Sequence, residues 1–389
     1  MDGAKRLKGI PGFSIDRVAE AAGEDPAVLR LENLDTDLPP PREAIEATRR
    51  AIGRDEDNSY LPFTGQRELR EAIAGRHRRA TGQPCDPTHV VVTCGGTEGL
   101  FDALLALTDP EDEVLLTDPT YAGMIYRVRL AGAVPRLVPF RPEEGAWRLD
   151  LDALRGAVTR RTRMLFLMNP SVPSGAVMSR EEWDTVAGLC RERDLWLLYN
   201  AAMERILFDG RSLIHPASLP GMAERTVTVG SVSKEFRMIG WRVGWTISPP
   251  GVAGDIARVH IYNAVTATGI AQKGARAALT ADRDDFERCR AEWERRRDVV
   301  SAALAGHGMI PAAGGWSQLL DVARLGHDSF TASRLLLEKG RVAATPMRDW
   351  GGPTADRYVR IVFSNEPVER LAELGARVDR ALGQGSPST

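Results

Sequence analysis

From His89 onward the sequence alternates short apolar segments with segments of helical periodicity, and this alternation restricts the fold more than any other feature. The apolar segments are too short for typical helices and too uniformly apolar to have a wet face, so we predict buried strands. They are HVVVTC, EVLLTD, RMLFLMN, LWLLYN, TVTVGSV and VGWTIS. Such strands alternating with helices are typical of a parallel sheet covered on both faces. We therefore predict an α/β fold with a mainly parallel central sheet.

The pattern changes after about residue 250, where helical periodicity dominates and is followed by mixed segments. A long helix is predicted over 286–305. The strands SQLLDVA and YVRIVFS flank a further helix in the same part of the chain. We predict a large domain over 46–285 and a smaller α+β domain over 286–389. The segment 1–45 is expected to pack on the smaller domain.

Composition and charge narrow the classes of partner. Hydrophobic residues make up 43% and charged residues 27% of the chain, as in ordinary globular proteins, and the net charge of −2 does not favour nucleic acid or an acidic membrane surface. No apolar run approaches the length of a membrane span or a signal peptide, and the four cysteines form no C-x-x-C pair. We expect a cytoplasmic protein with a small-molecule partner.

Lysine is rare in this chain, and one lysine stands where chemistry is expected. Of the 51 lysines and arginines only five are lysines, and Lys234 follows a predicted strand within SVSKEFRMIGWRVGW. A buried amine at a strand end can form a Schiff base with an aldehyde. The Ser231 hydroxyl and the Arg242 guanidinium can both bind a phosphate. Together they suggest pyridoxal phosphate, although S-x-S-K alone would also suit an exposed turn.

The full string S-x-S-K-x-F-x-x-x-G-x-R-x-G resembles the cofactor-lysine motif of the class I/II aminotransferases, which are fold type I pyridoxal-phosphate enzymes. The resemblance implies that Lys234 is the catalytic residue. Lys234 would bind the cofactor covalently and then move the proton at the substrate's α-carbon. It also implies that Ser231, Ser233 and Arg242 bind the cofactor.

Two further segments follow strands and extend the resemblance. CGGTEGL is similar to the family's phosphate-binding turn, which gives Gly95, Gly96 and Thr97 a cofactor-binding role. DPTYAGM resembles the segment whose aromatic side chain stacks on the pyridine ring, which gives that role to Tyr121. Taken alone, a Gly-Gly turn is usually a tight connection, and a tyrosine at a strand end could equally belong to the core.

The resemblance also implies a substrate and a partner. YVRIVFSN resembles the segment whose arginine binds the substrate's α-carboxylate, so Arg360 is assigned to an amino-acid substrate. An arginine within an apolar strand needs an anion. Tyr60, in YLPFTGQRELR, matches the tyrosine that reaches the phosphate in the neighbouring subunit, which implies a homodimer with shared active sites.

The chain departs from the family pattern around the cofactor ring. NPSVPSG is similar to the N-P-x-N-P-x-G loop, in which Asn169 is retained as a cofactor-binding residue but the second asparagine is Val172. YNAAMERILFDG places Asn200 where the family has an aspartate and Met203 where it has a tyrosine. In LENLDTDLPPP, Leu34 stands where a glycine would approach the substrate's carboxylate, which implies a reshaped substrate pocket.

These changes alter the expected chemistry. The family's aspartate keeps the ring nitrogen protonated, and a close carboxylate–cation pair is worth about 4 kcal/mol at an effective dielectric constant near 20. Asn200 is neutral, so the ring should withdraw electrons less strongly. We therefore expect poor ordinary transamination and favour another outcome at the α-carbon of an amino acid or amino-acid conjugate in specialised metabolism. Elimination, decarboxylation with deamination, or cyclisation would qualify, some of which are lyase reactions.

Two alternatives remain open. The first is an ordinary amino-acid aminotransferase that tolerates Asn200. The second is a non-catalytic, ligand-binding member of the fold, although the retention of Lys234 argues against it. The six histidines are scattered without ligand spacing, so no metal site is predicted.

Overall fold

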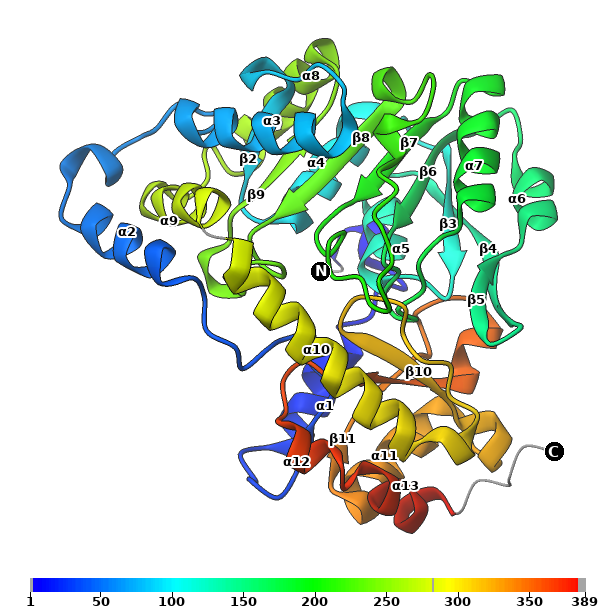
Figure 1. The fold of residues 1–389 in the computed structure, drawn as a ribbon. Coiled ribbons are helices and arrows are strands. Elements are labelled where there is room, and N and C mark those ends of the chain that lie inside the picture. Colours follow the sequence, from blue (N-terminus) through cyan, green and yellow to red (C-terminus); the bar gives the residue numbers. More distant parts are fainter. Residues whose placement is uncertain (1–2, 282, 384–389) are drawn as a thin grey trace.

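The computed structural model describes residues 3–281 and 283–383, and its central feature is an eight-stranded sheet (Figure 1). Strands β3, β4, β6, β7 and β8 pair in parallel, whereas the β2–β9, β9–β8 and β4–β5 pairs are antiparallel. In spatial order the strands are β2 (Val90–Thr93), β9 (Gly244–Ile247), β8 (Thr226–Ser231), β7 (Trp196–Asn200), β6 (Thr162–Met168), β3 (Glu113–Asp118), β4 (Val134–Glu143) and β5 (Ala146–Leu149). The predicted fold class is confirmed.

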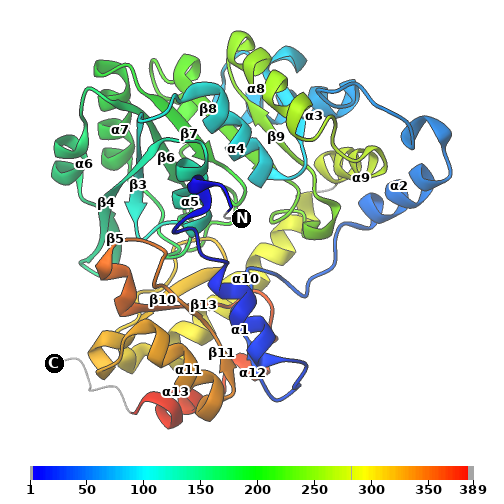
Figure 2. The ribbon, with the colours of Figure 1, turned by 180° about the vertical axis from the view of Figure 1, so that it is seen from behind.

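Helices cover both faces of this sheet (Figures 1 and 2). Alternate residues of one strand belong to different cores: Leu165 of β6 packs in one, and Met164 and Phe166 pack in the other. This double burial explains why the strand segments are uniformly apolar. The helices of this part are α2 (Arg42–Ile52), α3 (Arg67–Thr81), α4 (Gly96–Leu107), α5 (Ala122–Leu130), α6 (Leu151–Ala157), α7 (Arg180–Glu192), α8 (Pro250–Asn263) and α9 (Gly269–Thr280).

The remaining elements form a smaller α+β part below the large sheet in Figure 1. An antiparallel sheet has the order β10-β13-β12, and β1 pairs with β11 in parallel. These strands are β1 (Leu29–Arg30), β10 (Ser317–Asp321), β11 (Val342–Ala343), β12 (Thr345–Pro346) and β13 (Tyr358–Val362). The helices are α1 (Ser14–Ala22), α10 (Arg283–Ala303), α11 (Ser329–Gly340), α12 (Val368–Leu371) and α13 (Leu374–Leu382).

The N-terminal helix α1 lies against this smaller part, where it contacts β11 and β12 (Figure 2). The long helix expected over 286–305 corresponds to α10, which begins three residues earlier. The domain limits at 45 and 285 stay a prediction. Among the described residues, no helix has both the length and the apolar character that crossing a membrane requires.

Candidate active site

A pocket of about 360 Å³ brings together side chains from the whole length of the chain. Its walls come from α1, from the segment after β1, from the ends of β6, β7 and β8, from the start of α4 and from β13. The carboxyl edge of a parallel sheet is where ligands bind in open α/β folds. The residues expected from the sequence that line this pocket are Leu34, Gly96, Thr97, Tyr121, Val172, Asn200, Met203, Ser231, Ser233, Lys234, Arg242 and Arg360.

Lys234 follows β8 directly, and its amine is buried within this pocket. Its Nζ donates a hydrogen bond to the Leu34 carbonyl and lies 5.2 Å from the centre of the Trp316 ring. Burial lowers the pKa of Lys234 to about 8; Asp35 raises it, while Arg360 and Arg242 lower it further. A larger fraction of the amine is therefore neutral near physiological pH, which is the form that attacks an aldehyde.

The turn before α4 forms an anion-binding cradle with the segment after β8. Gly95 has φ of +82°, and a Cβ there would lie 2.5 Å from Arg242 Nη2. A Cβ on Gly244 would lie 2.2 Å from the Gly96 nitrogen, which explains the second glycine of the lysine motif. Arg242 Nη1 donates to the Ser233 hydroxyl at 3.4 Å. The backbone N–H groups at the start of α4 and this guanidinium suit a phosphate.

These features fit pyridoxal phosphate. The pocket contains a phosphate cradle, a buried amine of lowered pKa and an aromatic side chain, Tyr121, at the start of α5. Tyr121 is held from two sides: the Arg127 guanidinium lies 5.7 Å from its ring centre, and the Trp350 ring lies 6.3 Å away edge-on. Gly244 lets the cradle close tightly, because a side chain there would collide with the backbone of Gly95 and Gly96.

The three substituted positions also line this pocket. Val172 and Met203 are buried apolar side chains that offer no hydrogen-bond donor to a bound ring. Asn200, the last residue of β7, accepts a 3.1 Å hydrogen bond from the Ala202 nitrogen through its Oδ1. With its oxygen engaged in this way, Asn200 presents a neutral amide to the pocket. Val172, Asn200 and Met203 therefore line the pocket in which the family resemblance expects ring contacts.

Arg360 lies in the middle of β13 and is only 1% exposed. Its Nη2 donates to the Glu32 carbonyl and, at 3.3 Å, to the Thr345 hydroxyl. Its Nε has no hydrogen-bond partner within the described chain. Burial lowers the pKa of Arg360 to about 10, so the group stays charged near neutral pH. A buried guanidinium that lines a pocket suits an anion, and a carboxylate matches its geometry.

Trp350 links Arg360 to the N-terminal helix. No motif around Trp350 predicts this contact. The Trp350 ring centre lies 4.7 Å from the Arg360 guanidinium carbon, which is a cation–π distance. Its Nε1 donates to the Ser14 hydroxyl at 3.2 Å, at the start of α1. Ser14 and Trp350 are separated by 336 residues. Trp350 therefore positions both the guanidinium and the first turn of α1.

Three expected site residues do not line the pocket. Gly95 precedes Gly96, which lines the pocket, and its positive φ shapes the turn before α4. The Asn169 side chain is directed elsewhere, because its Oδ1 accepts a 2.8 Å hydrogen bond from the Met178 nitrogen. Tyr60 is 81% exposed and lies outside the pocket. The cofactor-binding roles of Asn169 and Tyr60 stay predictions.

The structure adds pocket residues that the sequence analysis missed. Phe13, Ile15 and Asp16, at the start of α1, line the pocket, and so does Asp35. Asp35 belongs to the segment LENLDTDLPPP, and its carboxylate beside Leu34 could have marked it as a site residue. The α1 residues gave none, because their nearness to Lys234 depends on the packing of α1.

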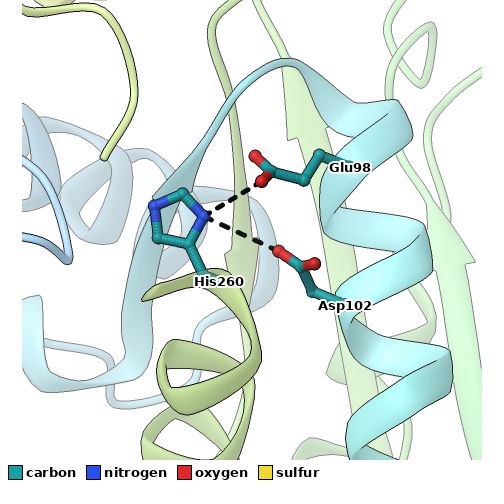
Figure 3. Close-up of side chains that lie close together, drawn as sticks. All are labelled: Glu98, Asp102 and His260. Atoms are coloured by element: carbon teal, nitrogen blue, oxygen red, sulfur yellow. Dashed lines mark hydrogen bonds and ion pairs between the residues drawn. The ribbon is translucent and has the colours of Figure 1, made fainter. Parts of the chain in front are cut away.

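A second charged cluster lies between α4 and α8 (Figure 3). His260 of α8 points toward Glu98 and Asp102 of α4, with Nδ1 3.3 Å from Glu98 Oε1 and 3.7 Å from Asp102 Oδ2. Burial lowers the pKa of His260, but the two carboxylates outweigh it and raise the pKa to about 9. Glu98 also accepts a hydrogen bond from the Cys94 nitrogen. The cluster thus ties α8 to the turn that contains Gly95.

Comparisons with known proteins agree with this geometry. The family model "Aminotransferase class I and II" matches residues 28–377. The chain is 33% identical over 368 residues to arginine–pyruvate transaminase of Pseudomonas aeruginosa, covering 93% of this chain and 92% of that protein. It is 35% identical over 365 residues to a probable N-succinyldiaminopimelate aminotransferase of Mycobacterium tuberculosis, covering 88% and 91%. The structure of aspartate aminotransferase from Thermus thermophilus with maleate superposes with a TM-score of 0.91 at 31% identity, covering 98% and 100% of the two chains.

Proposed function

Because the chain belongs to the class I and II aminotransferases, which are pyridoxal-phosphate enzymes, we propose that it transfers the amino group of an amino acid to a 2-oxo acid. The observation that carries this proposal is the shared pocket of Lys234 and Arg360. One supplies a buried amine at the reacting centre, and the other supplies a buried guanidinium for the substrate's carboxylate. The relatives named above are all transaminases or aminotransferases. Their names favour ordinary transamination over the elimination, decarboxylation or cyclisation that the substituted residues suggest.

Each residue has a definite task in this proposal. Pyridoxal phosphate, when bound, supplies an aldehyde and a ring that withdraws electrons from the substrate's α-carbon. The α4 turn, Ser231 and Arg242 hold the phosphate, and Tyr121 packs on the ring. Arg360 orients the amino acid by its carboxylate, so that the α-carbon hydrogen faces Lys234. Lys234 Nζ would take the proton from the α-carbon and deliver it to the carbon of the cofactor's former aldehyde group.

Leu34 takes part in this arrangement through its backbone. Its carbonyl accepts the hydrogen bond of Lys234 Nζ, and its side chain lines the pocket. The carbonyl holds the amine in place before the cofactor binds. The position expected to contact the substrate's carboxylate therefore also positions the catalytic lysine.

We also propose that two copies of the chain share their active sites. Tyr60 is 81% exposed in the single chain, and Phe63 nearby is 45% exposed. Exposed aromatic side chains of this kind are typical of an interface. In a dimer Tyr60 would reach the phosphate of the partner subunit. Replacement of Tyr60 by phenylalanine should then weaken cofactor binding about tenfold without unfolding the chain, and cofactor titration by fluorescence measures this.

The proposed function is tested by product analysis after a single turnover. The cofactor-loaded protein is mixed with an excess of an amino acid and no acceptor, and the 2-oxo acid and pyridoxamine phosphate are quantified. Lys234→Ala should abolish the conversion. Lys339→Ala, which removes an exposed lysine of α11, is the matched control and should leave it unchanged. Release of ammonia or carbon dioxide in place of the 2-oxo acid would contradict the proposal.

A further inference from the structure

The walls of the pocket divide into three groups, and one group has no role so far. The α4 turn with Ser231 and Arg242 belongs to the phosphate, and Tyr121 with the positions around Asn200 belongs to the ring. What remains is formed by the first residues of α1 and the segment 33–35. With its carboxylate on Arg360 and its α-carbon at Lys234, an amino acid can direct its side chain toward this wall.

This remaining wall is both apolar and acidic. Phe13 and Ile15 provide apolar surface, and Asp16 and Asp35 provide two carboxylates. Neither carboxylate forms an ion pair with a lysine, arginine or histidine among residues 3–281 and 283–383. Asp35 accepts a 2.7 Å hydrogen bond from the Thr36 nitrogen, and no side-chain donor bonds to Asp16 in that part of the chain.

The loaded pocket has no cationic side chain of its own left over for these two carboxylates. Its cationic groups are Lys234, Arg242 and Arg360. In the proposed function, the cofactor occupies Lys234 and Arg242, and the substrate's carboxylate occupies Arg360. Arg360 is buried and lines the pocket, which independently favours a carboxylate there. Asp16, which is exposed, and Asp35, which is half-buried, then form no ion pair among the described residues and can meet a cationic group of the substrate.

We propose that this enzyme selects amino acids whose side chain ends in a positive charge, with Asp16 as the residue that recognises that charge. The inference rests on the proposed function and adds the substrate class. A long side chain with a methylene stem and a terminal ammonium or guanidinium matches the wall, because the stem contacts Phe13 and Ile15 and the cation meets Asp16. Asp35, which lies beside Lys234, adds to the negative potential on this side of the pocket.

The position of Asp16 is fixed by contacts that also hold the carboxylate site. Ser14, two residues earlier, is bonded to Trp350, and Trp350 packs on Arg360. The two ends of the substrate are therefore recognised by residues held by one indole ring.

The test compares amino acids that differ in charge but little in shape. L-arginine is paired with L-citrulline, and L-lysine with L-norleucine, and dissociation constants are measured on the cofactor-loaded Lys234→Ala protein by calorimetry and absorbance. We expect each cationic member to bind at least tenfold more tightly than its neutral partner. Asp16→Asn should remove most of this preference and leave the neutral amino acids unaffected. Glu20→Gln, the same charge change one turn along α1, is the matched control.

The outcomes separate this inference from the proposed function. Equal binding of charged and neutral members, or an equal loss for both in Asp16→Asn, overturns the charge selection. Amino transfer from neutral or acidic amino acids but from neither arginine nor lysine overturns it too, while the proposed function stands. Selective binding of cationic amino acids without amino transfer by the unmodified enzyme would instead overturn the proposed function and leave the charge selection standing. Binding of none of these four amino acids overturns the charge selection, and the single-turnover experiment then decides the proposed function on its own.

Discussion

Replacement of Arg360 by lysine gives the sharpest quantitative prediction for the carboxylate site. The variant keeps a positive charge in β13 but removes the planar fork. Only Nη2 of Arg360 is bonded to the described chain, so the guanidinium lining the pocket keeps donors for a carboxylate, to which such a fork can donate two hydrogen bonds. Each such bond to a charged group contributes about 1.5–3 kcal/mol, and a lysine can retain one of them.

The expected loss is therefore one charge-assisted hydrogen bond, or a roughly 10- to 150-fold weaker binding of the amino acid. The corresponding amine, which lacks the carboxylate, should bind the variant and the unmodified enzyme about equally. Dissociation constants from calorimetry on both proteins give this double comparison. Arg357→Lys, which changes an arginine that pairs with Asp321 outside the pocket, is the matched control. An equal loss for the amine and the amino acid would show that Arg360 acts on the fold and not on the carboxylate.

Three further outcomes are expected. Asn200→Asp should accelerate the first half-reaction at least tenfold in stopped-flow absorbance, because a carboxylate can keep the ring nitrogen protonated; an unchanged rate would mean that Asn200 does not face that nitrogen. The rate of pyridoxal phosphate uptake by cofactor-free protein should rise with pH around a midpoint near 8, and a midpoint above 10 would contradict the burial of Lys234. The folded-state pKa of His260, about 9, exceeds its ordinary value of 6.5, so its stabilisation is complete below pH 6.5 and is lost as the pH rises through about 9. Chemical denaturation of His260→Gln should lack this pH dependence, which amounts to at most about 3 kcal/mol.

The sequence was most informative where function is encoded in neighbouring residues. The lysine motif combines a strand, a hydroxyl pair and two glycines within a short segment, and the clash between a Gly244 side chain and Gly96 shows why that spacing is needed. The helix starting near Ser179 was also predictable, because its capping box is local and is present in the structure. The alternation of apolar strands fixed the fold class for the same reason.

Relations between distant segments could not be predicted in this way. Ser14, Trp350 and Arg360 form one contact chain, but nothing in the sequence around any of them points to the others. Asp16 is an ordinary acidic residue of an amphipathic helix until α1 is placed beside the pocket. In the sequence His260 is far from any acidic residue of α4, yet in the structure it contacts Glu98 across the α4–α8 pair. Tertiary packing, which local patterns do not encode, creates these sites.

The most direct test of the central claim is the stoichiometry of one turnover by the cofactor-loaded protein. With excess amino acid and no acceptor, we predict one 2-oxo acid and one pyridoxamine phosphate for each active site, with no ammonia or carbon dioxide, and no product from Lys234→Ala. Regenerated pyridoxal phosphate accompanied by ammonia or carbon dioxide would show that the enzyme performs a different reaction. Failure of any amino acid to convert the cofactor would show that it is not an aminotransferase.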